Sequence, residues 1–197
     1  MPYDFSAARR LIESLPKELR DHTQGVSTLC RHLARRYGYD EDKAAFVGLV
    51  HDVARFMPPR DLMAKAQSLG IEVGLVEKAV PVLLHAPVGA DLLESDWGVT
   101  DPEILEAVAC HTTGREGMTL LDKILFVADK LEDGKTEYYP GLERARGLAE
   151  KDLDLALLEL FDWQVRRLLE RNALLHPRTI AARNDLLLKR GLAAASL

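Results

Sequence analysis

Apolar residues recur at three- and four-residue steps along most of this 197-residue chain, and the alternating patterns typical of strands are nearly absent. Glycine or proline often separates one apolar stripe from the next, as at Gly38, Gly70 and Pro58, where helices are expected to end or begin. The sequence therefore predicts an all-α fold. The expected helices lie near residues 6–14, 17–37, 41–55, 59–69, 73–80, 88–95, 101–111, 119–131, 142–149, 152–172 and 178–190.

Composition and charge narrow the classes of protein to which the chain can belong. A hydrophobic content of 47% is enough for one sizeable core, so we expect a single domain over 1–197. Its core is expected at about 18–132, with C-terminal helices at about 142–190 packed on it. The net charge of −5 argues against nucleic acid as the main partner but allows a polyphosphate.

Cysteine usage and the N-terminal segment indicate the cellular location. Cys30 and Cys110 are too few and too scattered for a disulfide framework or a thiolate metal site. The N-terminal segment has no apolar signal region, and no stretch approaches the length of a membrane span. We therefore expect a cytoplasmic protein with no membrane partner.

Histidines and aspartates occupy several positions at which a helix should be apolar. His51 and Asp52 are adjacent in AAFVGLVHDVARF, which carries no other charge from Ala44 to Val50. A buried carboxylate without a partner is costly, and a metal cation is a common partner. The pattern predicts a buried metal site built from a set of six residues: His22, His51, Asp52, His85, His111 and Asp129.

Helical spacing places three of these residues toward the core. His22 continues an apolar stripe that includes Val26, His111 follows Val108, and Asp129 shares a helix face with Leu125. A lone histidine on such a face is more often a hydrogen-bonded core residue than a ligand. Six coincidences together favour the metal site.

The other histidines fit their surroundings differently. His85 lies before Pro87, which should push Ala86 toward extended backbone, so His85 is expected at a helix end or bend. His32 is expected on a charged helix surface, and His176 precedes a proline at a helix boundary.

Hydroxyl, amide and guanidinium groups follow one of the candidate ligands directly. Thr112, Thr113, Gly114 and Arg115 come immediately after His111 and offer the donors that phosphate oxygens need. Arg55, one helical turn past His51, could add a second cation. Imidazole and carboxylate together suit iron, manganese, cobalt, nickel or zinc. The residues alone thus indicate a metal-dependent phosphohydrolase.

The order H, HD, H, H, D resembles the HD-domain superfamily of metal-dependent phosphohydrolases. Longer matches are similar to the YqeK family of bacterial symmetrical diadenosine tetraphosphatases, from about His22 to Asn184. These matches are GLVHDVAR, LLHAPVGA, HTTGREGMTLLDKILFVADKLEDGK, LAEKDLDLALLE and HPRTIAARN. The chain departs from the family pattern at Leu19, Arg55 and Lys130, where the family usually has arginine, lysine and tyrosine; these changes concern nucleotide contacts more than metal binding.

The resemblance implies an HD-domain helical bundle with the metal site in its core. It implies one or two iron ions and a core ligand set of His22, His51, Asp52 and Asp129. His85 and His111 could either complete a second metal position bridged by Asp52 or hydrogen-bond the substrate phosphates. In the end motif, His176 and Arg183 are expected to contact substrate.

The activity implied by the resemblance is hydrolysis of diadenosine tetraphosphate to two ADP by a metal-activated water, with Asp52, His85 and His111 as catalytic residues. Another HD-type phosphohydrolase, either a nucleotidase or an alarmone pyrophosphohydrolase, is one alternative. A non-enzymatic HD-type nucleotide sensor is another. The oligomeric state stays open, with a homodimer among the alternatives.

Overall fold

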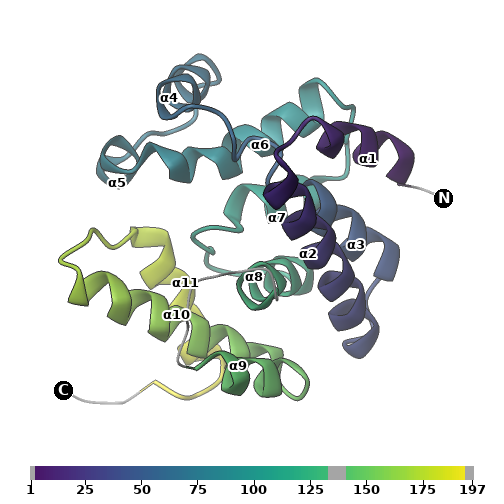
Figure 1. Ribbon diagram of the computed structural model, residues 1–197. Coiled ribbons are helices and arrows are strands. Elements are labelled where there is room, and N and C mark those ends of the chain that lie inside the picture. Colours follow the sequence, from purple (N-terminus) through teal and green to yellow (C-terminus); the bar gives the residue numbers. More distant parts are fainter. Residues whose placement is uncertain (1–2, 133–140, 194–197) are drawn as a thin grey trace.

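The computed structural model describes residues 3–132 and 141–193, and all regular elements in these ranges are helices (Figure 1). The prediction of an all-α fold is confirmed. None of these helices combines the length and the apolar character needed to cross a membrane. The elements are α1 (Phe5–Glu13), α2 (Lys17–Arg36), α3 (Glu41–Val50), α4 (Pro59–Ser68), α5 (Leu75–Ala79), the 3-10 helix η1 (Pro81–Leu84), α6 (His85–Ser95), α7 (Pro102–Cys110), α8 (Leu120–Leu131), α9 (Leu142–Ala149), α10 (Leu153–Glu170) and α11 (Pro177–Lys189).

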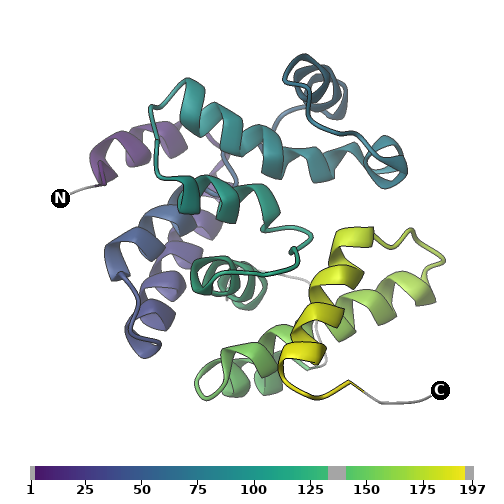
Figure 2. The same ribbon diagram turned by 180° about the vertical axis from the view of Figure 1, so that it is seen from behind.

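Helix α8 lies at the centre of the molecule in both views (Figures 1 and 2). It packs against α2, α3 and α7 as well as against α9 and α10. The helix begins with a capping box, in which the Thr119 hydroxyl accepts from the Asp122 amide and the Asp122 carboxylate accepts from the Thr119 amide. Because neighbours cover most of its surface, α8 is mostly apolar, and the carboxylates of Asp122 and Asp129 are held inside the core.

The C-terminal helices share the main core. The rings of Phe126 on α8 and Phe161 on α10 lie 4.7 Å apart between centroids. Gly114, in the loop after α7, packs closely against Phe161, since a Cβ at this residue would lie 2.8 Å from the Phe161 ring. The φ angle of Gly114 is +70°, a backbone conformation that residues other than glycine rarely adopt. The loop after α7 is thereby fixed between the central helix and the C-terminal helices.

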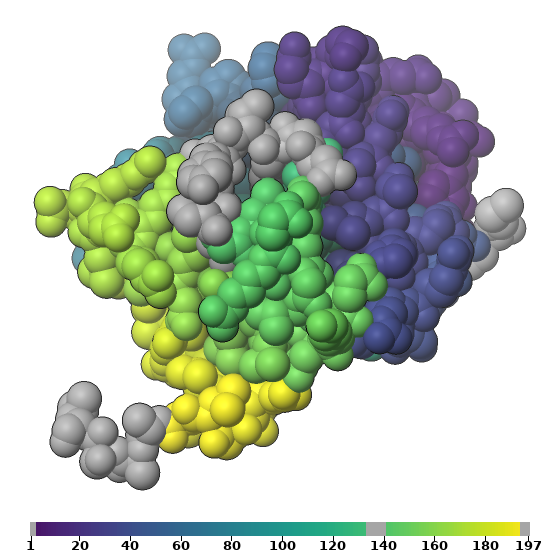
Figure 3. All heavy atoms as spheres, turned by 60° about the horizontal axis from the view of Figure 1, so that its bottom comes forward, coloured from purple at the N-terminus to yellow at the C-terminus, as the bar shows by residue number. Residues whose placement is uncertain are grey.

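Hydrogen bonds join α9 to the end of α2. His32 contacts Glu150 at 2.7 Å, and the Tyr37 hydroxyl donates to the carbonyl of Ala149 at 2.7 Å. Figure 3 shows the green surface of α9 adjoining the dark blue surface of the N-terminal helices. His32 is exposed, as the sequence predicts. The extent of the single domain, 1–197, stays a prediction.

A smaller apolar cluster lies beneath α4, η1 and α6. It contains Ala54, Leu62, Ala66, Leu84 and Val88. In Figure 1, α4, α5 and α6 lie on the other side of α8 from α9 and α10. This arrangement places the start of α6 above the middle of the molecule.

Two local expectations were wrong. The helix expected over 41–55 ends at Val50, and residues 51–56 form turns. Ala86 is helical rather than extended, because Pro87 falls in the first turn of α6, where an amide hydrogen has no partner within the helix. His85 nevertheless lies at a helix start, as expected.

Candidate metal centre

The six predicted ligands come from five parts of the chain and meet beside α8. His22 lies within α2, His51 and Asp52 follow α3, and the others lie at the start of α6, the end of α7 and within α8. Five of the six are buried, and the His22 side chain is only 14% exposed. Residues more than a hundred positions apart thus share one site.

The carboxylate of Asp52 divides the site into two groups of ligands. Its Oδ1 lies 3.0 Å from Nε2 of His85 and 3.3 Å from Nε2 of His111. Its Oδ2 faces the other side, 3.6 Å from Nε2 of His51 and 4.0 Å from Nε2 of His22. Asp52 therefore belongs to both groups.

Asp129 completes the group that contains His22 and His51. Its Oδ1 lies 3.1 Å from Nε2 of His22 and 3.6 Å from Nε2 of His51. The donor atoms of these three residues, and likewise those of His51, Asp52 and His111, are close enough to hold one ion.

Backbone carbonyls set the tautomers of three histidines. His51, His85 and His111 each lie at a helix end and direct Nδ1 to the carbonyl of the residue three positions earlier. A carbonyl oxygen can only accept, so Nδ1 carries a hydrogen in each ring, and in the neutral ring Nε2 keeps a lone pair. All three Nε2 atoms point into the site ready to bind a cation. The carbonyls belong to Gly48, Val82 and Val108, at 2.8 Å for the first and 2.7 Å for the last.

His22 is oriented by a side chain instead, because it lies in the middle of α2, where backbone carbonyls are engaged in the helix. Its Nδ1 contacts Oε2 of Glu132 at 3.0 Å. Gly25, one turn further along α2, leaves room for this carboxylate, since a Cβ there would lie 2.5 Å from Glu132 Oε1. Glu132 is not among the six residues predicted from the sequence. Its position three residues after Asp129, on one face of the same helical turn, is the signal that could have found it.

The spacing of the lone pairs shows that the site fits a metal. Nε2 of His85 and Nε2 of His111 are 3.1 Å apart, and both lie near Asp52 Oδ1, so three acceptor atoms face one another. Within the described residues, His51 Nε2 and Asp52 Oδ1 are buried and make no hydrogen bond. Such an arrangement is costly unless a cation lies among the acceptors. Acceptor atoms 3.0–3.3 Å apart can bind the same metal ion, each at a distance of about 2.0–2.2 Å from it.

The protonation states of Asp52 and His111 also suit a cation. Burial alone would raise the pKa of Asp52, but the imidazoles of His51, His111 and His85 hold it well below its ordinary value. Burial lowers the pKa of His111 to about 4, with the neighbouring histidine rings acting in the same direction against the attraction of the Asp52 carboxylate. At neutral pH, the site therefore presents a carboxylate and a neutral imidazole, the forms that bind metals.

Lys130 is a cation in direct contact with this centre. Its Nζ lies 2.7 Å from Asp129 Oδ2 and donates to the carbonyl of His111 at 3.1 Å. The ammonium group also lies over the ring of Phe126, 4.1 Å from the centroid. Lys130 thus links α8 to the end of α7 at the edge of the site.

The predicted phosphate-binding loop packs tightly on α8. The Arg115 guanidinium is bound to the buried carboxylate of Asp122, at 2.7 Å from Nη2 and 2.9 Å from Nε. The Thr113 hydroxyl is buried and donates to the carbonyl of Gly114. Thr112 is half-buried, and Arg55 is exposed on the turn after Asp52. Contact of these residues with substrate stays a prediction.

The residues of the end motif connect helices. His176 caps α11, accepting at Nδ1 from the amide of Arg178, and its Nε2 contacts Glu77 of α5 at 2.8 Å. Arg183 of α11 forms an ion pair with Asp162 of α10. Their predicted role in substrate binding is also untested.

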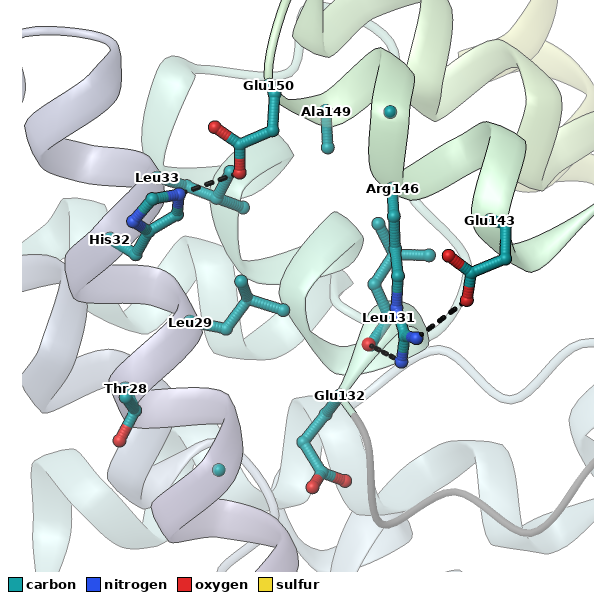
Figure 4. A pocket seen from close by; sticks show the side chains of 12 residues that line it. Thr28, Leu29, His32, Leu33, Leu131, Glu132, Glu143, Arg146, Ala149 and Glu150 are labelled. Carbon is teal, nitrogen blue, oxygen red and sulfur yellow. Dashed lines mark hydrogen bonds and ion pairs between the residues drawn. The ribbon is translucent and has the colours of Figure 1, made fainter.

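Two cavities border the centre, and Glu132 lines both. A cavity of about 650 Å³ lies along α10, and we call it the α10 cavity. A second one, of about 870 Å³, lies between α2 and α9, and we call it the α2–α9 cavity (Figure 4). The segment LEDGKTEYYPG after Asp129 is expected from the sequence to form a loop that borders the metal site, and most of it, residues 133–140, lies outside the described residues.

Comparisons with known proteins identify relatives over most of the chain. Residues 19–134 match the family model of the HD domain. A symmetrical bis(5'-nucleosyl)-tetraphosphatase of Bacillus subtilis is 37% identical over 163 residues, covering 83% of this chain and 86% of its relative. The protein of the same name in Staphylococcus aureus is 31% identical, covering 92% and 93%.

A solved structure with the same fold also belongs to the HD superfamily by its description. It is the crystal structure of a predicted HD superfamily hydrolase involved in NAD metabolism from Clostridium acetobutylicum. The two chains superpose with a TM-score of 0.89 at 32% identity, over 95% of this chain and 98% of the other. The fold described above is thus one already observed by crystallography.

Proposed function

The chain belongs to the HD domain family, in the group of the symmetrical bis(5'-nucleosyl)-tetraphosphatases, and we propose that it hydrolyses diadenosine tetraphosphate to two molecules of ADP. The relatives that carry this name cover most of the chain. One observation carries the proposal: three acceptor atoms lie within 3.0–3.3 Å of one another in a buried site. They are Nε2 of His85, Nε2 of His111 and Oδ1 of Asp52.

We propose that two cations share Asp52. His22, His51 and Asp129 would hold one of them with Asp52 Oδ2, and His85 and His111 would hold the other with Oδ1. Imidazole and carboxylate ligands favour a transition metal, and we propose iron, with manganese, cobalt, nickel and zinc compatible with the same ligands. When bound, such ions lower the pKa of a water molecule and offset negative charge on phosphoryl oxygens.

The protein's own residues would orient the ligands and receive the substrate. The carbonyls that fix the three helix-end histidines prevent the rings from turning, and Glu132 does the same for His22. Lys130 carries a positive charge beside Asp129, where it can bind a phosphate oxygen of the tetraphosphate. Burial of the ligands excludes bulk water, which strengthens each of these electrostatic interactions.

The alternatives are less well supported. A nucleotidase or an alarmone pyrophosphohydrolase would use the same ligands, but the relatives that match most of this chain carry another name. A sensor without activity would not need a full ligand set, and all six residues are present here. We also propose a cytoplasmic location, with a homodimer as one alternative for the oligomeric state.

The test is a product analysis with metal-loaded protein. Diadenosine tetraphosphate, nucleoside mono- and triphosphates and guanosine tetraphosphate are incubated separately, and the products are resolved by ion-exchange chromatography. We expect diadenosine tetraphosphate to be cleaved fastest, with ADP as its only product. Equal amounts of ATP and AMP, or faster cleavage of another member of the panel, would contradict the proposal.

A further inference from the structure

The α10 cavity and the α2–α9 cavity meet at Glu132 but differ in charge. The α2–α9 cavity is lined by the carboxylates of Glu132, Glu143 and Glu150, with Arg146 and His32 paired to two of them (Figure 4). An anionic ligand would meet mainly negative charge there. This cavity is therefore a poor site for a nucleoside polyphosphate.

The α10 cavity has the opposite character. Among the described residues, its charged lining consists of Lys130, Arg167 and Arg171 with one acid, Glu132, and Lys130 is itself paired with Asp129. The chain as a whole has a net charge of −5, so three cations around one cavity are a local concentration of positive charge. Such a lining favours phosphate groups.

A stripe on α10 supplies one wall of this cavity. Trp163, Arg167 and Arg171 follow one another at four-residue steps and so lie on the same side of the helix, over a length of roughly 12 Å. The Arg167 guanidinium lies over the Trp163 ring, 5.2 Å from its centroid, and steadies the indole. Apolar side chains complete the lining, among them Val80, Leu160 and Leu168.

The α10 cavity is lined by residues that contact both halves of the metal centre. Lys130 lines the cavity and contacts Asp129, a ligand of the first group. Val82 also lines it, and the Val82 carbonyl accepts from Nδ1 of His85 in the second group. A molecule that fills the cavity would thus have one end beside the centre and the other against α10.

We propose that the α10 cavity binds the nucleoside of one half of the substrate, with the base against Trp163 and the adjoining phosphates at Arg167 and Arg171. This inference rests on the proposed function, because it assigns a place to one nucleoside of the dinucleotide. The volume of about 650 Å³ lies within the range of roughly 300–1,000 Å³ usual for small-molecule sites. An indole and flanking cations match a base attached to phosphates.

The first experiment measures binding without turnover. The chain has two tryptophans, and Trp97 lies on the segment between α6 and α7, so a Trp97→Phe protein reports on Trp163 alone. ADP, the expected product, is titrated while tryptophan fluorescence is recorded. We expect saturable quenching, and at least a tenfold weaker Kd when Arg167→Ala is added. Adding Arg166→Ala instead is the matched control, since Arg166 is the neighbouring exposed arginine on α10, and it should leave Kd unchanged.

The second experiment measures kinetics with substituted Trp163. Loss of base stacking costs roughly 5- to 100-fold in affinity, so Trp163→Leu should raise KM for diadenosine tetraphosphate by about that factor, with kcat within threefold of wild type. Trp163→Phe keeps an aromatic ring and should retain most of the affinity, which separates stacking from a loss of packing. Thermal unfolding of each variant checks that it folds.

The outcomes separate this inference from the proposed function. If Trp163→Leu and Arg167→Ala bind ADP and turn over substrate as wild type does, the α10 cavity is not the nucleoside site, although the reaction stands. If ADP binds as described but the tetraphosphate is not cleaved to ADP, the reaction is wrong and the nucleoside site stands. ADP that fails to quench Trp163, together with an unchanged KM in Trp163→Leu, would overturn the inference.

Discussion

His85 and His111 direct their Nε2 atoms at each other across 3.1 Å, while the Nδ1 atom of each donates to a carbonyl of its own chain segment. Two lone pairs held face to face favour a cation between them and Asp52. If the second cation exists, His85→Ala and His111→Ala should each reduce bound metal from about two per chain toward one. Elemental analysis of the purified variants measures this directly.

A phosphate-binding role for His85 and His111 predicts a different metal content in these variants. If they bind phosphates instead, metal content stays at the wild-type value while kcat falls, because only a transition-state interaction is lost. Full metal and full activity in both variants would show that the two rings serve packing alone. Kinetics and metal content are therefore measured on the same preparations.

Glu132 is expected to act through His22. Glu132→Gln keeps the size of the side chain but removes the negative charge beside Nδ1, which should weaken metal binding roughly 10- to 100-fold. Glu143→Gln is the matched control, because this carboxylate lines the same α2–α9 cavity and contacts Arg146 instead. Competition with a chelator gives both affinities. Equal affinities in the two variants would show that Glu132 does not orient the ligand.

Arg115 is expected to matter for stability. Arg115→Ala leaves the buried Asp122 carboxylate without its ion-pair partner and should lower the free energy of unfolding by about 2 kcal/mol. The loss is smaller than for a fully buried pair because the Arg115 guanidinium is partly exposed. Urea unfolding measures this change. A KM for diadenosine tetraphosphate measured on the same variant tests the predicted phosphate contact.

The stability that Arg115→Ala loses should depend on pH in a definite direction. Burial raises the pKa of Asp122, against the lowering by Thr119 and Arg115. Removing Arg115 raises that pKa further, so the folded variant binds a proton more tightly than the unfolded chain does. The deficit should therefore be largest at neutral pH and should shrink as the pH falls through the folded-state pKa. A deficit that stays constant between neutral and acid pH would argue against this pairing.

The helices follow from the sequence because short-range rules place them. α7 begins at Pro102 after the Asp101 cap, one residue from the expected start at 101, and α9 matches the expected bounds of 142–149. The six candidate ligands could be named because three of them share helix faces with apolar residues and His51 and Asp52 lie together in an apolar run, which made a shared site with His85 the simplest explanation. Their division into two groups around Asp52 came only from the family resemblance, as one of two alternatives, because no local pattern shows how distant helices pack.

Other features depend on contacts that no local pattern contains. Glu132 reaches His22 only because the end of α8 lies beside the middle of α2. Arg115 follows a ligand in sequence, yet it is bound by Asp122, a residue that reads from sequence as an ordinary helix cap. The cationic stripe on α10 resembles an exposed helix face until the cavity beside it is known.

Asp52 belongs to both groups of ligands, so its replacement should affect the whole centre. In Asp52→Asn, the amide cannot neutralise a cation, and we expect bound metal to fall well below one per chain and turnover to be lost. Circular dichroism checks that the variant remains helical. Wild-type metal content in this variant would remove Asp52 from the centre.

The central claim is that a metal centre at these residues cleaves diadenosine tetraphosphate symmetrically. The most direct measurement titrates a transition metal into chelator-treated wild-type protein and records ADP formation against the number of ions bound per chain. We predict no cleavage without metal and a rise in rate that ends near two ions per chain, with ADP as the only product. Undiminished cleavage by metal-free protein would contradict the account.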